Sequence, residues 1–226
     1  MINAVILMPE ITKGMKSLGP KGLLSINKKT LIVDHQIRLL KSINKHIKIH
    51  AVIGFEHEKV IPILLKHKVD YVYNKEYKNF NQGYSLQLYL SKILKINKLL
   101  IINNGILLNA VDTIKKSLLD NRSQIFTIKN GKSDFDLGTL TGISPEYIFY
   151  DLPESWIECV YFGSNDISSL RDIVSTNIAR NMYLFEILNV YISKYPKSIT
   201  KTYIEKKQAL KINTIKDITK AKRFIL

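Results

Sequence analysis

The sequence of 226 residues contains a single cysteine, Cys159, so the chain cannot form an internal disulfide. This is typical of a protein from a reducing compartment, and we expect Cys159 to be a small buried apolar residue rather than a nucleophile. Long hydrophobic runs are also missing, since the longest, such as residues 99–102, have only the length of a strand. The first apolar segment has no basic region before it and is too short for a signal peptide. We therefore expect a cytoplasmic protein with no membrane partner.

Arginine is scarce although the chain is strongly basic. The formal net charge is +15, but only five of the 34 basic residues are arginine. Lysine is the weaker residue for bidentate contacts to phosphates or bases. The chain has no run of five or more basic residues and no aromatic–basic motif of an RNA-binding sheet. We favour a solvated lysine-rich surface that reflects coding bias, and keep nucleic acid or another polyanion as an alternative partner.

Segments of strand length alternate with segments of helical periodicity over the first hundred residues. Strands are predicted at residues 2–8, 50–54, 69–73 and 99–103, and helices at residues 30–42, 56–66 and 85–95. Ser85 is the predicted N-cap of the third helix. This alternation predicts a mostly parallel sheet with right-handed crossovers.

The alternation changes after residue 110, where strands are joined by polar turns. Helices are predicted at residues 111–120, 164–174, 181–194 and 215–224, and strands at residues 124–129, 137–143, 156–162 and 209–212. No linker, repeat or low-complexity tract interrupts the chain. We therefore expect one α/β domain over residues 1–226.

Eight short motifs follow one another along the chain. They are AVIL (4–7), PKGLLSI (20–26), DHQI (34–37), AVIGF (51–55), YNKEY (73–77), NQGYSL (81–86), residues 99–109 and KINTIKDI (211–218). Their order resembles that of the nucleotidyltransferase superfamily with the nucleotide-diphospho-sugar transferase (GT-A-like) fold, which includes sugar-phosphate nucleotidylyltransferases and phosphocholine cytidylyltransferases. The resemblance implies a three-layer Rossmann-like α/β fold, with a mixed, mostly parallel sheet and helices on both faces.

The loop after the first strand departs from the pattern of that superfamily, which reads roughly AAGxGxR and wraps the phosphates of the nucleotide. Both glycines are replaced here, by Glu10 and Thr12, and Gly14 stands at the arginine position. A carboxylate beside phosphates repels them by about 1 kcal/mol or more even at high effective dielectric. Triphosphate binding in the usual manner is therefore weakened.

Other phosphate-binding positions of the superfamily are better kept. The resemblance makes Lys21, in the Pro-Lys pair, the residue that balances phosphate charge, and it is the one catalytic candidate. It places Met8 and Pro9 beside the nucleotide, where Lys13 or Lys16 would supply the positive charge that Gly14 does not carry. A surface lysine after a turn proline is the alternative for Lys21.

The two aspartates that hold Mg²⁺ in the superfamily are both absent. Their positions are occupied by Gly105, which has no side chain, and Asn213, which is a poor Mg²⁺ ligand without a neighbouring carboxylate. Asp112 or Asp217 could replace them, but each is better explained as a residue at the start of a helix. No metal site is predicted, and Mg²⁺ is expected only if the protein is active.

The loop that faces base and substrate in the superfamily keeps its character. The resemblance makes Asn81, Gln82, Gly83 and Ser85 nucleotide-binding candidates, because they offer amides, a glycine and a hydroxyl. A tight turn before a helix explains these residues equally well.

Three functions follow from these observations. We favour a nucleotidyltransferase-fold protein that has lost metal-dependent catalysis and binds a nucleotide, a nucleotide-sugar or a protein assembly partner. The second is an active, divergent nucleotidyltransferase that uses an NTP and Mg²⁺ to form an NDP-sugar or a CDP-choline-like product. The third is a basic scaffold protein that contacts nucleic acid or another polyanion, and it rests on charge alone.

Overall fold

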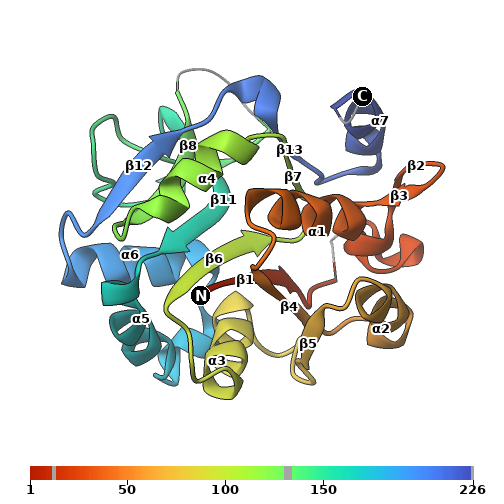
Figure 1. Cartoon of the computed structure of the whole chain (residues 1–226), viewed down its shortest axis with the longest axis horizontal. Helices are drawn as coiled ribbons and strands as arrows, with labels where there is room; N and C mark the ends of the chain where they lie inside the picture. The colour runs from red at the N-terminus through yellow and green to blue at the C-terminus, as the bar shows by residue number, and fades with distance from the viewer. Residues whose placement is uncertain (12–13, 130–133, 225–226) are drawn as a thin grey trace.

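A nine-stranded sheet runs through the protein, and strand β1 lies in its parallel half (Figure 1). The computed structural model describes residues 1–11, 14–129 and 134–224. The parallel strands follow the order β6-β1-β4-β5, with bounds Lys98–Asn103, Ile2–Met8, Lys48–Ile53 and Asp70–Tyr73. These strands are largely apolar because helices cover both faces of a parallel sheet.

The other half of the sheet is mainly antiparallel and is built on β11 (Glu154–Phe162). This strand pairs antiparallel with β6, β8 and β9, while β12 pairs parallel with β8. The remaining bounds are Ser123–Ile128 for β8, Leu137–Thr139 for β9, Phe149–Tyr150 for β10 and Ile199–Tyr203 for β12. The pairing of β11 with β8 shifts register between Trp156 and Val160, so β11 carries an irregularity near its middle.

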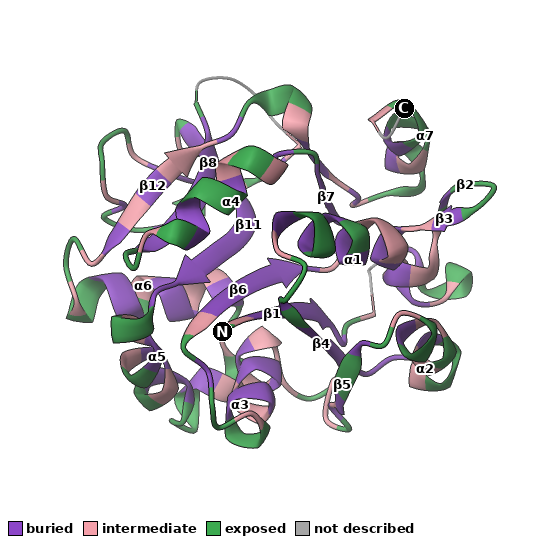
Figure 2. Cartoon of the chain, viewed as in Figure 1, coloured by how far each residue is buried: buried purple, intermediate pink, exposed green. Residues whose placement is uncertain are grey.

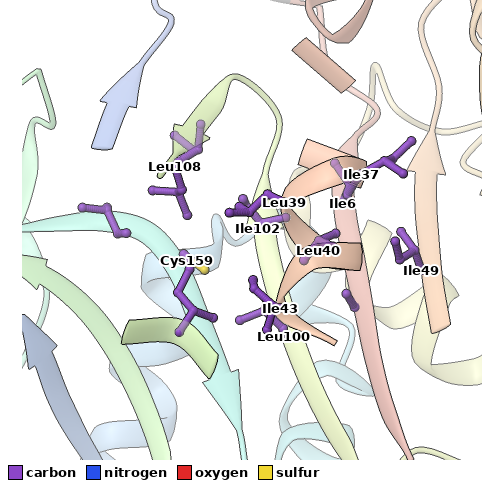
Figure 3. Close-up of a cluster of buried hydrophobic side chains, with 14 of the residues drawn as sticks. Ile6, Ile37, Leu39, Leu40, Ile43, Ile49, Leu100, Ile102, Leu108 and Cys159 are labelled. Carbon is purple, nitrogen blue, oxygen red and sulfur yellow. The ribbon is translucent and has the colours of Figure 1, made fainter. Parts of the chain in front are cut away.

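Helices pack on both faces of the sheet and make three layers. One face is covered by α1 (Ile32–Ile43), α2 (His57–Lys66) and α4 (Val111–Leu119), and the other by α3 (Gln82–Lys92), α5 (Ile167–Val174) and α6 (Leu184–Lys194). Alternate strand residues serve the two layers: Ile6 packs with α1, as Figure 3 shows, and Leu7 belongs to the cluster under α3. Figure 2 shows the central strands buried and the outward helix faces exposed.

A third, smaller apolar cluster lies outside the main sheet. It joins α7 (Ile215–Phe224) to the hairpin of β2 (Ser25–Asn27) and β3 (Thr30–Leu31) and to the ribbon of β7 (Ile106–Leu108) and β13 (Ala209–Lys211). Figure 1 shows α7 beside this hairpin. The ribbon leads from the end of β6 to the start of α7, so it brings the last part of the chain next to the central strands.

The predicted fold class is confirmed, with several corrections at the level of elements. Ser85 is not an N-cap, since α3 begins at Gln82 and Asn81 takes the cap position. The strand predicted at residues 137–143 ends at Thr139, and β10 and β12 were not predicted. The helix predicted from residue 181 begins at Leu184, after a 3-10 turn. Within the described residues, no helix has the length and apolar character needed to cross a membrane.

Candidate functional site

A polar cavity of about 190 Å³ lies at the carboxyl ends of β1 and β6. From β1 the sheet extends to β4 on one side and to β6 on the other, which makes this a topological switch point. Ligands of open α/β sheets bind at such points. The lining residues are Leu7, Met8, Glu10, Lys21, Gln82, Asn103, Asn104, Glu158, Lys211 and Asn213.

Lys21 enters the cavity from a short 3-10 turn, Lys21–Leu23, that follows Pro20. Its side chain lies against Gly105, where an added Cβ atom would be 2.6 Å from the lysine Cδ and 3.3 Å from Nζ. Gly105 has a φ of +89°, a left-handed conformation that favours glycine. Lys21 therefore fills the space that a side chain at position 105 would occupy. Burial lowers the pKa of Lys21, and the negative charges of Glu158 and Glu10 oppose this shift.

Glu158 and Lys211 form a close ion pair in the wall of the cavity. Glu158 lies at the irregularity in β11 and has a φ of 54°. Such irregularities redirect a side chain and are over-represented beside active sites. Asn103 Nδ2 donates a hydrogen bond of 2.9 Å to Glu158 Oε2, which fixes the carboxylate from a second strand.

Glu10 follows the end of β1, and its side chain is exposed at the cavity. Neighbouring protein atoms desolvate the carboxyl group and raise its pKa, whereas Lys21 and a hydrogen bond from Gln82 lower it. Because the side chain is exposed, water screens these interactions. The site thus carries the carboxylates of Glu10 and Glu158 and the ammonium groups of Lys21 and Lys211, so its charges balance.

Two buried amide oxygens in the cavity wall, Asn103 Oδ1 and Asn104 Oδ1, have no hydrogen-bond partner among the described residues. The backbone that carries them is fixed. Gln36 Nε2 donates to the carbonyls of Asn103 (2.9 Å) and Ile106 (3.0 Å), and the Asn104 amide donates to Leu7 O (2.9 Å). Leaving a buried acceptor unpaired is costly. These two oxygens therefore indicate a place for a hydrogen-bond donor from a ligand or a water molecule.

The structure brings together part of the predicted site. Met8, Lys21 and Gln82 line the cavity, Asn213 lines it as well, and Gly105 lies under Lys21. Pro9 is at the end of β1, where its carbonyl accepts a 3.0 Å hydrogen bond from the Phe55 amide. Lys13 and Thr12 lie outside the described residues. The binding roles of these residues stay predictions.

Three other predicted residues lie near the start of α3, and the structure gives each a partner within the protein. Asn81 Nδ2 donates to Asn181 O at 2.5 Å, and Ser85 Oγ accepts from Asn74 Nδ2 at 3.0 Å. Gly83 is buried, and an added Cβ atom would lie 1.9 Å from Ala179 O. Glycine is therefore required here for close packing, and none of the three is among the lining residues of the cavity.

Sequence reasoning missed Asn103, Asn104, Glu158 and Lys211. Two signals were available. Glu158 is the one charged residue in an otherwise apolar run, residues 156–162, and Lys211 directly precedes the Ile-Asn-Thr motif at the expected metal position. The asparagines directly precede Gly105 at the end of a central strand, where polar side chains reach the carboxyl edge of the sheet.

A second cavity, of about 180 Å³, shares Gln82, Asn103, Glu158 and Lys211 with the first. Its other walls are aromatic and acidic, and they comprise Asp136, Leu137, Tyr150, Trp156, Tyr183 and Phe185. Phe185 packs edge-on to Tyr150 and is stacked with Tyr183, with ring centroids 6.0 Å and 6.2 Å apart. Trp156 is fully buried, as expected of a core residue, although it contributes to this wall. The two cavities therefore adjoin, one lined mainly by charged and polar groups and the other largely by aromatic rings.

The residues at this site do not fit a Mg²⁺ ion held by paired carboxylates. Asp217 Oδ2 accepts hydrogen bonds from the Asn213 and Thr214 amides (3.1 and 2.8 Å), as the cap of α7, and Asp112 is exposed on α4. Across the described residues no cluster of three or more His, Cys, Asp or Glu residues could hold a metal. Both carboxylates in the cavity have a lysine ammonium group as a neighbour, which competes with a divalent cation for them.

Comparison with solved structures finds nucleotidyltransferases at low sequence identity. CTP:phosphocholine cytidylyltransferase from Streptococcus pneumoniae superimposes with a TM-score of 0.81 and 16% identity, over 100% of this chain and 99% of that one. UDP-glucose pyrophosphorylase, solved in complex with UDP-glucose, gives a TM-score of 0.76 and 10% identity, over 99% of this chain and 98% of that one. Inositol-1-phosphate CTP transferase from T. maritima gives 0.73 and 14%, over 99% and 95%. The chain therefore has the fold of these enzymes.

Comparison by sequence gives no such match. No protein-family model matches the chain, and no curated protein sequence matches it significantly. At these identities the structural likeness establishes the fold, and the function has to be argued from the site.

Proposed function

We propose that the chain binds a nucleotide or nucleotide-sugar in the two adjoining cavities and has lost Mg²⁺-dependent nucleotidyl transfer. The observation that carries the proposal is the position of Lys21, which lies against Gly105 where the superfamily has a metal-binding aspartate. The lysine that would bind phosphates is thus kept, while the two aspartates that would bind Mg²⁺ are replaced by Gly105 and Asn213. We therefore expect the protein to bind its ligand without turnover, because Mg²⁺ stabilises the charge that develops during nucleotidyl transfer and its aspartate ligands are missing here.

Several features support a ligand of this size and polarity. The cavities measure about 190 and 180 Å³ and meet at Glu158 and Lys211, so together they fall within the range of roughly 300–1,000 Å³ that is common for small-molecule sites. In the charged half, Lys21 and Lys211 suit phosphates and the two carboxylates suit hydroxyl groups of the ligand, while the aromatic half suits an apolar or cationic group. The structurally similar proteins act on nucleotides or bind a nucleotide-sugar.

An active, divergent nucleotidyltransferase is the second candidate. Lys21 stands at the position that balances phosphate charge in the superfamily, and Glu158 supplies a buried carboxylate in the same cavity. This candidate requires Mg²⁺ to bind at Glu158 or Glu10 in competition with lysine. It predicts release of pyrophosphate when an NTP and a phosphorylated acceptor are supplied together.

The test is isothermal titration of the purified protein with CTP, UTP, GTP and ATP. We expect one nucleotide or its sugar conjugate to bind with a Kd on the order of micromolar, and Lys21→Met to weaken it about tenfold or more by removing a charge-assisted hydrogen bond. Lys28→Met is the matched control, because Lys28 is exposed in the turn between β2 and β3. The same samples are then incubated with Mg²⁺, glucose 1-phosphate and phosphocholine.

Pyrophosphate release that disappears in Lys21→Met would overturn the loss of catalysis and establish the second candidate. Absence of any nucleotide binding, with or without Mg²⁺, would overturn the proposal as a whole. In that case the site would be a remnant, and a protein assembly partner would become the leading function.

A further inference from the structure

We propose that Lys21 and Lys211 bind the phosphate groups of the ligand in place of a divalent cation, so that this site prefers the metal-free form of a phosphorylated ligand. This inference rests on the proposed function and deepens it. It reverses the metal dependence expected of a nucleotidyltransferase fold, in which Mg²⁺ accompanies the phosphates into the site.

Lys21 lies close to the position of the first metal-binding aspartate of the superfamily, which is Gly105 here. A Cβ atom added at position 105 would be 3.3 Å from Lys21 Nζ, so the ammonium group lies in the space that an aspartate side chain at this position would occupy. The close approach is built into the backbone, because Gly105 adopts a φ of +89° and its carbonyl accepts a 2.9 Å hydrogen bond from the Ile212 amide. The lysine is thus packed into this position by the turn that carries Gly105 and by the start of the α7 segment.

Lys211 is the second lysine of this cavity. Its side chain comes from β13 and is only 15% exposed, and, in addition to burial, its nearby charge lowers the pKa of Lys21. It pairs closely with Glu158 and lies 3.7 Å from Asp136 Oδ2. A lysine ammonium group has three donors, so Lys211 keeps hydrogen-bonding capacity for a phosphate oxygen while Glu158 holds it in place. Lys21 and Lys211 therefore present donors to the same cavity from two separate elements, the turn after Pro20 and β13.

Two asparagine side chains complete the polar lining of the cavity. Asn103 Oδ1 and Asn104 Oδ1 are buried acceptors with no partner among the described residues, and they require donors. A phosphorylated ligand with hydroxyl groups supplies phosphate oxygens for the two lysines and hydrogen-bond donors for the two asparagine oxygens. A Mg²⁺ ion bound to the phosphates would compete with Lys21 and Lys211 for the phosphate oxygens and would bring its hydration shell into a cavity of only about 190 Å³.

The experiment compares the wild-type protein in EDTA and in excess Mg²⁺, with inorganic pyrophosphate and the four nucleoside triphosphates as probes in isothermal titration. Pyrophosphate tests the lysine pair without any contribution from a base. We expect pyrophosphate and the preferred nucleotide to bind in EDTA, and Mg²⁺ to raise both Kd values about tenfold. This comparison needs no variant and is independent of any effect of mutation on folding.

Variants then test whether Lys211 contributes to the binding of pyrophosphate in EDTA. Lys211→Met should raise the Kd for pyrophosphate about tenfold or more, while Lys211→Arg keeps the charge and most of the affinity. Lys207→Met is the matched control, since Lys207 is exposed on the preceding turn and pairs only with Glu205 among the described residues. Circular dichroism at each titration temperature establishes that the variants are folded.

The outcomes separate this inference from the proposed function. Nucleotide binding that requires Mg²⁺, with no pyrophosphate binding in EDTA, would overturn the inference, leave nucleotide binding in place and point to a metal held by Glu158 and the free asparagine oxygens. Failure of every probe in both conditions would overturn the two together. Binding in EDTA that Lys211→Met leaves unchanged would overturn the role of Lys211.

Discussion

His50 is buried within the central sheet together with other polar groups. Its side chain is 4% exposed, Asn3 Nδ2 lies 3.4 Å from its Nε2, and its ring centroid is 5.3 Å from that of Tyr89. Burial lowers the pKa of His50 below its ordinary value of 6.5, an effect that Asp70 opposes and Lys48 reinforces. The folded protein therefore holds a neutral histidine where the unfolded chain becomes protonated in mild acid.

This gives a signed prediction for stability. A group whose pKa is depressed in the folded state binds fewer protons there, so stability falls as the pH drops below about 6.5, by up to about 1.4 kcal/mol per pH unit for one proton. His50→Gln should flatten the curve of unfolding free energy against pH between about pH 7 and pH 5, with urea denaturation as the measurement. His35, whose pKa is also lowered by burial, is still present in the variant and contributes a slope of the same sign. An unchanged slope in His50→Gln would contradict the prediction.

At the site, one predicted residue and two unpredicted ones differ in how far apart they are in sequence. Lys21 lies in a turn soon after the first strand and lines the cavity, and its phosphate-binding role stays a prediction. Glu158 and Lys211 are separated from it by more than a hundred residues, and only the pairing of β11 with β6 and of β13 with β7 brings them there. Gly83 was predicted as a nucleotide-binding residue, but it packs against Ala179, a contact about a hundred residues away that the loop sequence does not indicate.

At the scale of elements, a buried ion pair joins β11 to β12 across β8. Lys201 Nζ lies 2.7 Å from Glu154 Oε2, and their side chains are 0% and 4% exposed. Lys201 Nζ also donates to Leu140 O at 2.6 Å, and Tyr203 donates to Glu154 Oε1 at 3.1 Å. The pair thus fixes the chain that follows β9 against the edge of the sheet.

Removing one partner of this pair should be more harmful than removing both. Lys201→Met leaves the Glu154 carboxylate buried without its cation and should lower the free energy of unfolding by about 3–5 kcal/mol. Lys201→Met with Glu154→Leu should recover much of that loss, because no uncompensated charge remains. Urea denaturation of both variants, with the exposed Lys222→Met as control, measures the difference. A cost below about 1 kcal/mol for Lys201→Met would show that water or rearrangement compensates the carboxylate.

The elements that were missed or misplaced lack a clear sequence pattern, each for its own reason. β12 has the sequence Ile-Thr-Lys-Thr-Tyr, and a buried lysine in its centre hides the apolar alternation that marks a strand. β10 has only two residues, which is too short for any periodicity. The parallel strands β1, β4 and β6 were predicted because each is an apolar run buried on both faces. Helix α3 was predicted three residues late because its first turn, Gln-Gly-Tyr, has the composition of a loop.

The whole molecule carries a net charge of +15, and this charge is the basis of the third function considered. The first cavity of the candidate site has two carboxylates and two ammonium groups, and the second adds Asp136, so the excess positive charge belongs to the rest of the protein. Several ion pairs outside the site, such as Lys59 with Glu56 and Lys207 with Glu205, link residues close in sequence at or near the surface, and these contribute little. Self-repulsion among the remaining lysines therefore opposes the compact state.

Salt should consequently stabilise this protein. The Debye length shortens from about 30 Å at 0.01 M salt to about 8 Å at 0.15 M, which screens repulsion between lysines on opposite sides of the molecule. We expect Tm to rise over this range, by about 2–4 °C for each kcal/mol of repulsion removed from a chain of this size. Lys115→Gln with Lys116→Gln, both exposed on α4, should reduce the dependence of Tm on salt by lowering the net charge. A Tm that falls with salt would mean that attractive ion pairs, including Lys211 with Glu158 and Lys201 with Glu154, outweigh the surface repulsion.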